Sequence, residues 1–457
     1  MDKLLVKTGN GIIRGVRKIG HLVFRGIPYA KAPVGELRWK RPEPPLKWDG
    51  IREARFFANR PFEPGYPLGT SFGKEFGIDE DYIPPMSEDC LYLNIWAPAE
   101  TVKVKDADDI KFPAGEKLPV AFWIHGGGFF NGYASEPEYD GAAFAKRGVI
   151  LVTVGYRLGV LGFLVHPWLS EEGGGISGNY GLYDQVAALD WVRENISLFG
   201  GDPDNITIFG QSAGAVSVQA LVSSKLTRGK IKGAILQSGG GYNPSLIWFR
   251  PRDAAEEIGR QFVNFCQVKS LEEFRALPGE KILEFQTAFL AHWKVEHPGD
   301  RLPIRPCVDN LFLDDIDYKI LEQGAHHNIP YMIGCTAVDA GVTPEQAKAG
   351  ERSYLYKAAA GFCSLNEKPG RSPAWMYIFS QEPQGDNAGA HHSSELYYLF
   401  GTLDRNWRPR TPGDYALSER IISYWTNFFE TGNPNGNDVP DWRPYTDKDS
   451  YIMELRC

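Results

Sequence analysis

Short apolar runs alternate with longer stretches of helical periodicity along most of this chain. The runs that predict buried β-strands span residues 91–96, 119–125, 149–155, 206–209, 233–238, 329–334 and 374–380. Between the third and fourth runs, Val186, Leu189, Val192 and Ile196 recur at helical spacing and predict a helix over residues 183–199. This alternation predicts an α/β fold with a mostly parallel central sheet flanked by helices.

Three regions depart from that core pattern. Residues 1–16 (MDKLLVKTGNGIIRGV) alternate apolar and polar positions, which predicts N-terminal antiparallel strands rather than a signal peptide. Residues 101–117 are polar and charged, which favours a long solvent loop. Residues 245–328 are mainly helical without strong strand patterns, so we expect a helical cap insertion within one domain of residues 1–457.

Composition and charge exclude several classes of function. The 457 residues include 49 Lys and Arg against 57 Asp and Glu, and the net charge of -8 gives no general attraction to nucleic acid. No stretch approaches the roughly 20 apolar residues that cross a bilayer, so no membrane insertion is expected. Six scattered cysteines without a C-x-x-C pair favour free thiols and a cytoplasmic protein. The oligomeric state is not defined by these features.

The motif G-x-S-x-G, which marks the nucleophile of many serine hydrolases, occurs twice. Around Ser212, the strand-like ITIF precedes the motif and the helical AVSVQALVSS follows it. That strand, turn and helix context is the one a nucleophile elbow requires, so Ser212 is the predicted nucleophile. The other copy, residues 69–73, follows a Pro-rich segment and precedes a polar stretch, which predicts an ordinary loop.

A glycine run supplies the second part of a serine-hydrolase site. His125 and three glycines directly follow the strand-like PVAFWI. Glycines there let backbone N–H groups approach a substrate carbonyl, as in the HGGG-type oxyanion holes of esterases. We therefore assign Gly127 and Gly128 as oxyanion donors, together with Ala213 after the nucleophile. A formal G-x-G-x-x-G at residues 173–178 lacks a preceding strand and predicts a flexible loop, not a dinucleotide site.

The acid and base of a triad in this fold follow the serine in the order Ser, acid, His. Of nine histidines, only His391 and His392 lie late enough, and physical reasoning from the residues does not choose between them. Asp339 follows the strand IPYMIG and is the first candidate acid, with Asp309 as the alternative. No metal-ligand spacing accompanies the paired histidines, so neither a catalytic metal nor another cofactor is expected.

Long segments of the chain resemble one known family. They include FRGIPYAKAPVGELRWKRPEP, SEDCLYLNIWAP, WIHGGGF, GNYGLYDQ, FGGDPDNITIFGQSAGA, LQSGG and GAHHSSEL. In these segments the chain resembles the type-B carboxylesterases, which include cholinesterases and bacterial esterases of the para-nitrobenzyl esterase kind. The resemblance runs nearly end to end and implies the α/β-hydrolase fold and serine carboxylesterase activity on a small-molecule ester, through an acyl-enzyme intermediate.

The resemblance also implies roles for particular residues. It places Ser212, Asp339 and His392 in a triad, since the family's histidine stands three residues before a glutamate, here Glu395. It further implies an oxyanion hole at Gly127, Gly128 and Ala213. Supporting roles fall to Glu395, to Arg38 and Glu88, which match an ion pair of the family, and to Ser238 beneath the triad.

Departures from the family pattern bear on the substrate. The family's acid is commonly Glu, whereas this chain has Asp339. No Trp lies at positions 50–94, where a cholinesterase would bind a quaternary ammonium, so choline esters are not expected. Only 53 positions separate Asp339 from His392, which implies a lost helical segment and a more open mouth. Bulky or aromatic acyl esters, such as feruloyl esters, or acetyl esters are therefore a hypothesis, and a non-catalytic cholinesterase-like binding module is the alternative function.

Overall fold

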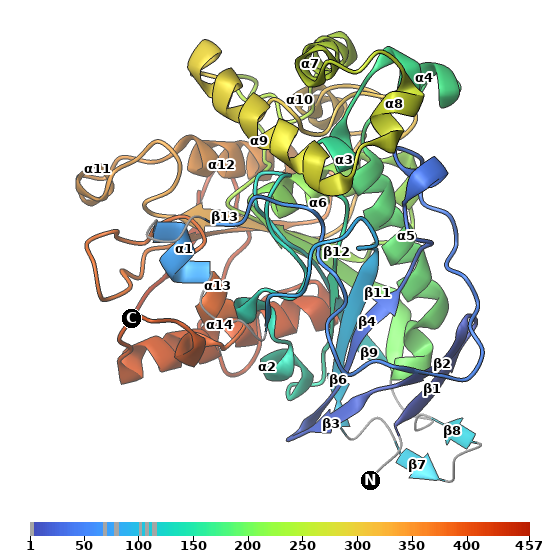
Figure 1. Cartoon of the computed structure of the whole chain (residues 1–457). Helices are drawn as coiled ribbons and strands as arrows, with labels where there is room; N and C mark the ends of the chain where they lie inside the picture. Colours follow the sequence, from blue (N-terminus) through green and yellow to red (C-terminus); the bar gives the residue numbers. More distant parts are fainter. Residues whose placement is uncertain (1–3, 67–70, 77–81, 100–102, 106–108, 112–116) are drawn as a thin grey trace.

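The computed structural model describes residues 4–66, 71–76, 82–99, 103–105, 109–111 and 117–457. Within them, a ten-stranded sheet forms the centre of the molecule (Figure 1). Its strands, in spatial order, are β15 (Ile452–Leu455), β14 (Ala374–Phe379), β13 (Tyr331–Thr336), β12 (Gly233–Gln237), β11 (Gly201–Gln211), β9 (Leu118–Ile124), β10 (Ile150–Val154), β6 (Tyr92–Pro98), β4 (His21–Pro28) and β3 (Val16–Lys18).

The strands from β15 to β10 run parallel, and β6, β4 and β3 continue the sheet in antiparallel pairs. All seven strands expected from the apolar runs are present, which confirms the mostly parallel sheet. Strand β15 was not expected, because its four residues, IMEL, are too short a run to stand out from the surrounding polar sequence.

Side chains of β9 alternate between the two faces of the sheet. Phe122 and Ile124 join one buried cluster, whereas Ala121 and Trp123 join another. The first cluster lies under α5 (Tyr180–Asn195), α6 (Ala213–Ser223) and α12 (Tyr354–Asn366). The second lies under α2 (Ala142–Ala145), α13 (Leu396–Leu399) and α14 (Pro412–Thr431). Both faces of the sheet are therefore covered, as a parallel sheet requires.

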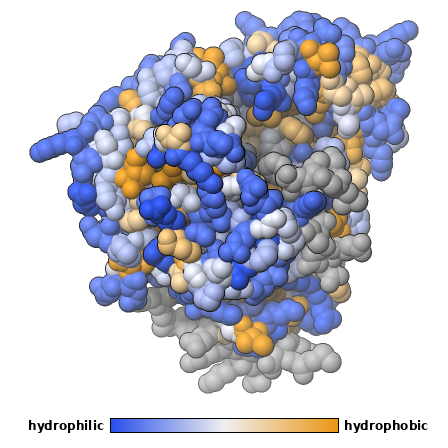
Figure 2. All heavy atoms as spheres, turned by 90° about the vertical axis from the view of Figure 1, so that its left-hand side faces the viewer, coloured by the Kyte–Doolittle hydropathy of each residue, from blue (hydrophilic) through white to orange (hydrophobic). Residues whose placement is uncertain are grey.

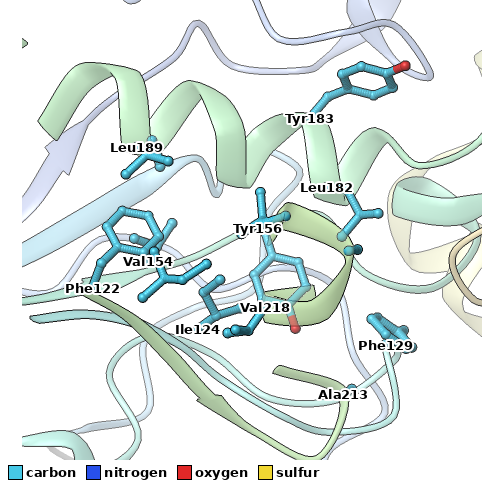
Figure 3. Packing of buried hydrophobic residues seen from close by; sticks show 14 of the residues in the cluster. Phe122, Ile124, Phe129, Val154, Tyr156, Leu182, Tyr183, Leu189, Ala213 and Val218 are labelled. Carbon is cyan, nitrogen blue, oxygen red and sulfur yellow. The ribbon is translucent and has the colours of Figure 1, made fainter. Parts of the chain in front are cut away.

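The core between the sheet and α5 shows how this packing is achieved (Figure 3). Leu189 of α5 lies over Phe122 of β9 and Val154 of β10, and Leu182 extends from the other end of the helix toward the sheet; each of these four side chains is fully buried. Burial of a Leu or Phe side chain contributes about 1.5–3 kcal/mol. The helix expected over residues 183–199 begins three residues earlier, and its last turn, η5 (Ile196–Phe199), is a 3-10 helix that ends at Gly200.

The N-terminal strands form a hairpin, as expected. Strands β1 (Leu5–Thr8) and β2 (Gly11–Arg14) pair antiparallel, and β5 (Ile51–Glu53) extends them into a separate small sheet. Residues 101–117 depart from the expected loop, because β7 (Lys103–Lys105) and β8 (Asp109–Lys111) pair as an antiparallel hairpin. In each of these two strands a β-branched residue stands between polar ones, a pattern too short to predict a strand.

Helices dominate residues 245–328, where the structure has α7 (Arg252–Cys266), α8 (Leu271–Ala276), α9 (Gly279–Glu296) and α10 (Asp317–Glu322). In Figure 1 these helices lie together at the top, beside α3 (Gly159–Phe163) and α4 (Pro167–Glu172). The short helix α11 (Pro344–Lys348) lies on the left of the same view.

Two glycine-rich motifs fall outside the sheet. Residues 173–178 form turns after α4, as expected for a loop. In the other motif, Gly69 and Thr70 lie outside the described residues, and α1 (Ser71–Phe76) begins at its serine. The three described residues of this motif, 71–73, are therefore helical and differ from the ordinary loop that the sequence predicted.

The cysteines are free thiols, and most of them are buried. All six cysteines are unpaired, and all but Cys457 are buried.

The left-hand face of Figure 1 is mainly hydrophilic, with hydrophobic side chains in small separate groups (Figure 2). In the part of the chain that the structure describes, no helix is both long and apolar enough to cross a bilayer.

Candidate active site

Ser212 occupies a sharp turn between β11 and α6. Its φ of 56° and ψ of −123° lie outside the regions that L-residues favour, and its N–H donates a 2.8 Å hydrogen bond to the carbonyl of Gln237. A Cβ at Gly210 would lie 2.6 Å from the backbone of Gly214, and one at Gly214 would lie 2.1 Å from the carbonyl of Ile124. The two motif glycines therefore allow the close packing that forces the turn.

The glycine run after β9 faces this turn. Gly127 has a φ of 102°, and a Cβ there would lie 2.1 Å from the carbonyl oxygen of Asn131. Gly128 has a φ of 65°, which also favours glycine. The N–H groups of Gly127, Gly128 and Ala213 donate to no other described residue. Ala213 is the first residue of α6, so its N–H also lies at the positive end of a helix dipole.

His392 and Asp339 form the strongest polar contact of the site. Nδ1 of His392 lies 2.7 Å from Oδ1 of Asp339, which lies in the loop after β13. Burial disfavours the imidazolium, but the charge and hydrogen bond of Asp339 outweigh it and raise the pKa of His392 above 6.5. Burial likewise opposes ionisation of Asp339, yet the charge of His392 and the hydrogen bonds it receives lower its pKa. The pair favours an ionised Asp339 beside a basic imidazole.

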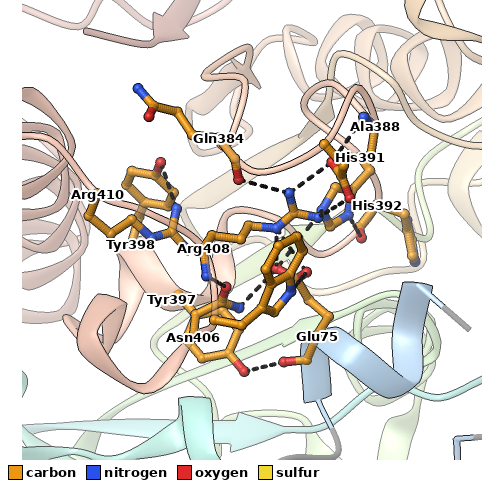
Figure 4. Close-up of polar contacts among 12 residues, drawn as sticks. Glu75, Gln384, Ala388, His391, His392, Tyr397, Tyr398, Asn406, Arg408 and Arg410 are labelled. Carbon is orange, nitrogen blue, oxygen red and sulfur yellow. Dashed lines mark hydrogen bonds and ion pairs between the residues drawn. The ribbon is translucent and has the colours of Figure 1, made fainter. Parts of the chain in front are cut away.

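The neighbouring histidine belongs to a different network (Figure 4). Nε2 of His391 lies 3.4 Å from a guanidinium nitrogen of Arg408. Arg408 is held by two carboxylates, Glu75 at 2.9 Å and Asp386 at 2.8 Å. The structure thus brings His392, and not His391, to Asp339.

The alternative acid, Asp309, is engaged elsewhere. It accepts hydrogen bonds from Asn179 at 3.0 Å and from the Tyr183 hydroxyl at 2.9 Å. Three backbone N–H groups, of Leu311, Phe312 and Leu313, complete its shell. Asp309 therefore closes a loop and does not contact either histidine of the 391–392 pair.

A cavity of about 630 Å³ joins the serine, the glycines and the histidine. This volume is within the roughly 300–1,000 Å³ of ligand pockets. The cavity is lined by Tyr66, Phe76, Gly126, Gly127, Gly128, Phe130, Asn131, Glu136, Glu138, Tyr139, Gln211, Ser212, Lys294, His392, Ser393 and Leu396. No group of three or more His, Cys, Asp or Glu side chains is arranged to hold a metal within the described ranges.

Gln211 was not singled out from the sequence, yet its side-chain amide nitrogen lies 3.1 Å from Nε2 of His392. Ser212 Oγ forms no hydrogen bond with His392 in the described part of the chain. Gln211 could have been predicted from its position in the sequence. The residue before an elbow serine ends the strand that leads into the turn, so it lies next to the nucleophile.

The ion pair of Arg38 with Glu88 forms away from the cavity wall, whereas Ser238 and Glu395 lie near the Asp339–His392 contact. Nε of Arg38 donates to Glu88 at 2.7 Å, and the Arg38 guanidinium also donates to the carbonyl of Leu277 at 2.8 Å. Ser238 is buried at the end of β12 and helps to lower the pKa of Asp339, although its Oγ makes no well-aligned hydrogen bond to a described residue. Burial raises the pKa of Glu395 to about 7.

The parallel sheet, with a strained serine between β11 and α6, defines the α/β-hydrolase fold. The chain belongs to the carboxylesterase family, whose model matches residues 2–359 and 359–457, and it is a carboxylic ester hydrolase. Para-nitrobenzyl esterase of Bacillus subtilis (strain 168) is 32% identical over 500 residues, covering 100% of this chain and 95% of the relative. Fumonisin B1 esterase of Sphingopyxis macrogoltabida is also 32% identical, with 99% and 86% covered.

Solved structures agree with this assignment. A thermophilic para-nitrobenzyl esterase superposes with a TM-score of 0.83 at 30% identity, covering 99% of this chain and 96% of that one. A carboxylesterase of Geobacillus stearothermophilus gives a TM-score of 0.78 at 31% identity, with the same coverage. The fold and the family expected from the sequence are thereby confirmed.

Proposed function

We propose that Ser212, His392 and Asp339 hydrolyse carboxylic esters through an acyl-enzyme intermediate. The observation that carries the proposal is the 2.7 Å contact of His392 with Asp339 at the cavity that Ser212 also lines. With Nδ1 bound to the carboxylate, Nε2 is left to act as the general base. In the first step the Ser212 side chain rotates, and its hydroxyl takes the place of the Gln211 amide at Nε2 of His392.

The chemistry then follows from the positions of the donors. Ser212 Oγ attacks the ester carbonyl carbon, and its proton passes to His392 Nε2. The N–H groups of Gly127, Gly128 and Ala213 hold the oxyanion, and His392 returns the proton to the leaving alcohol. Water then attacks the acyl-enzyme with His392 again as base, which releases the acid and restores the serine.

Replacement of the serine tests this assignment. Ser212→Ala should remove turnover of p-nitrophenyl butyrate, and a fluorophosphonate probe should label the native protein at Ser212 but not the variant. Substantial esterase activity in Ser212→Ala would falsify the assignment. A native protein that neither labels nor turns over any ester would instead favour the non-catalytic binding module.

For the substrate, we propose bulky or aromatic acyl esters, such as feruloyl esters, or acetyl esters. Two features support this proposal. The cavity of about 630 Å³ has room for an aromatic acyl group. The spacing of 53 residues between Asp339 and His392 leaves little chain to narrow its mouth, and the helices of residues 245–328 supply the proposed cap within a single domain. Turnover of methyl ferulate should be compared with that of p-nitrophenyl butyrate, and a lack of feruloyl turnover would remove the feruloyl part of the proposal.

A further inference from the structure

Two buried glutamates, Glu136 and Glu138, form part of the wall of the Ser212 cavity. They flank Pro137 at the start of η4 (Pro137–Tyr139), and their exposed fractions are 3% and 1%. Oε1 of Glu136 and both carboxyl oxygens of Glu138 have no well-aligned hydrogen-bond partner among the described residues. We refer to these two side chains as the carboxyl pair. Burying carboxyl oxygens without hydrogen-bond donors costs free energy, so this position favours a ligand that supplies donors.

A nearby buried carboxylate shows what a purely structural arrangement looks like in this protein. Glu75 receives the Arg408 guanidinium at 2.9 Å and the Asn406 amide at 2.9 Å, and Figure 4 shows both groups directed at it. Its charge is therefore compensated within the fold. Within the described residues, no ion pair joins a cation to either glutamate of the carboxyl pair.

The arginine that acts on Glu136 is already engaged. Arg60 acts on Glu136 electrostatically, but its guanidinium forms an ion pair with Glu63. Glu63 also accepts the backbone N–H groups of Gly65 at 3.2 Å and Gly132 at 3.3 Å. The fold thus satisfies Glu63 with a cation and backbone donors, whereas the carboxyl pair is hydrogen-bonded only by Tyr139 and within the pair among the described side chains.

The charge state of the carboxyl pair suits a ligand that is itself positive. Burial raises the pKa of Glu136 to about 7, against hydrogen bonds with the side chains of Tyr139 and Glu138. Burial, and then the charge of Glu136, raise the pKa of Glu138 well above its usual range. The pair therefore retains protons near neutrality, and a cation beside it would favour release of those protons and bind to the resulting carboxylates.

The rest of the cavity wall is compatible with a protonated amine. Tyr66, Phe76 and Tyr139 line the same cavity, and aromatic faces attract cations. Lys294 also lines the cavity, but it is exposed on α9, where solvent and salt screen its charge. Three of the four carboxyl oxygens have no well-aligned donor among the described residues. An ammonium group with an N–H supplies such a donor, and a quaternary ammonium does not.

We propose that the carboxyl pair binds a protonated amine of the ester substrate, so that amine-bearing esters are preferred over neutral esters of the same shape. This inference rests on the proposed ester hydrolysis at Ser212. It names a substrate class by charge: esters whose alcohol or acyl part carries a primary, secondary or tertiary ammonium group.

The test compares esters that differ mainly in one atom. At neutral pH, kcat/KM of the full-length protein is measured for dimethylaminoethyl butyrate and for isopentyl butyrate, in which carbon replaces the nitrogen. We expect a preference for the amine of about tenfold or more, since a charge-assisted hydrogen bond has that effect. Butyrylcholine, which has the charge but no N–H, should be turned over less efficiently than the amine.

Variants test whether the carboxyl pair causes the preference for the amine ester. Glu138→Gln and Glu136→Gln should each move the ratio of the two kcat/KM values toward one, whereas Glu171→Gln, at an exposed position on α4, should leave the ratio unchanged. If a carboxyl-pair variant does not fold, inhibition of the native protein still tests the proposal. Isopentylamine should inhibit hydrolysis of p-nitrophenyl butyrate at lower concentration than isopentyl alcohol does.

The outcomes separate this inference from the proposed function. Turnover of p-nitrophenyl butyrate without any preference for the amine ester, or with no advantage of isopentylamine as inhibitor, overturns the amine site alone. An amine preference that persists in both Gln variants also overturns it. Absence of turnover of every ester overturns the hydrolysis on which the inference depends.

Discussion

The side-chain amide of Gln211 lies 3.1 Å from Nε2 of His392, the ring nitrogen that is not bound to Asp339. Gln211 directly precedes Ser212, so the amide and the serine hydroxyl reach the histidine from neighbouring positions of one turn. Both groups therefore compete for the same nitrogen. A charge placed at residue 211 should act directly on the basicity of the imidazole.

Gln211→Glu should raise the pKa of His392 further, because a carboxylate beside an imidazole favours the imidazolium. The active form carries a neutral His392, so the acidic limb of the kcat/KM profile should move to higher pH and activity at neutral pH should fall. Gln211→Ala removes the amide without adding charge and should not move that limb upward. An unchanged limb in Gln211→Glu would show that residue 211 does not act on the base.

Asp339→Asn should lower kcat by roughly 10⁴-fold, by analogy with the same substitution in other Ser-His-Asp enzymes. In the native protein Asp339 raises the pKa of His392 above 6.5, and activity is lost as the pH falls through that raised value. Without the carboxylate, burial lowers the pKa of the imidazole against only the weaker effect of the Glu395 charge, so any residual activity should extend to lower pH. Asp309→Asn is the control and should affect stability more than kcat, because Asp309 bonds a loop. The reverse result would assign the acid to Asp309.

Gly127→Ala should reduce kcat about 100-fold or more, a loss typical of damage to an oxyanion hole. The added Cβ would lie 2.1 Å from the carbonyl of Asn131 at a φ of 102°, so the loop has to shift and displace its N–H groups. Gly299→Ala is the matched control, since a Cβ there meets nothing within 4 Å. Kinetics with p-nitrophenyl butyrate and thermal unfolding of both variants would separate lost catalysis from lost folding. Equal kcat values for the two variants would contradict the assignment of this loop.

Arg38→Ala should lower the free energy of unfolding by about 3–5 kcal/mol, because it leaves Glu88 with an uncompensated charge. The side chains of Arg38 and Glu88 are only 6% and 13% exposed, and Arg38 also donates to the carbonyl of Leu277 beyond α8. Lys31→Ala breaks an exposed ion pair with Glu43 and should cost about 1 kcal/mol or less. Denaturant unfolding measures both. Similar losses in the two variants would mean that Arg38 does not tie these segments together.

The sequence alone determined the parts of this protein that depend on local chemistry. The strand-like ITIF and the helix-forming AVSVQALVSS fix the elbow at Ser212, since β and α periodicities are properties of neighbouring residues. The glycines before Phe129 and the apolar runs of the sheet are readable for the same reason. Strand β15 and the pairing of β7 with β8 were not, because such short segments gain stability only from the strands beside them.

Tertiary structure decided which of several eligible side chains meet. His391 and His392 are adjacent and equally basic in the sequence, but only folding directs one toward Asp339 and the other toward Arg408. Asp309 is excluded from the histidines by bonds to residues over 100 positions away, and Glu136 and Glu138 are buried in the cavity wall by segments remote in sequence. Hydrogen bonds and desolvation depend on distances in space, which no local pattern of residues encodes.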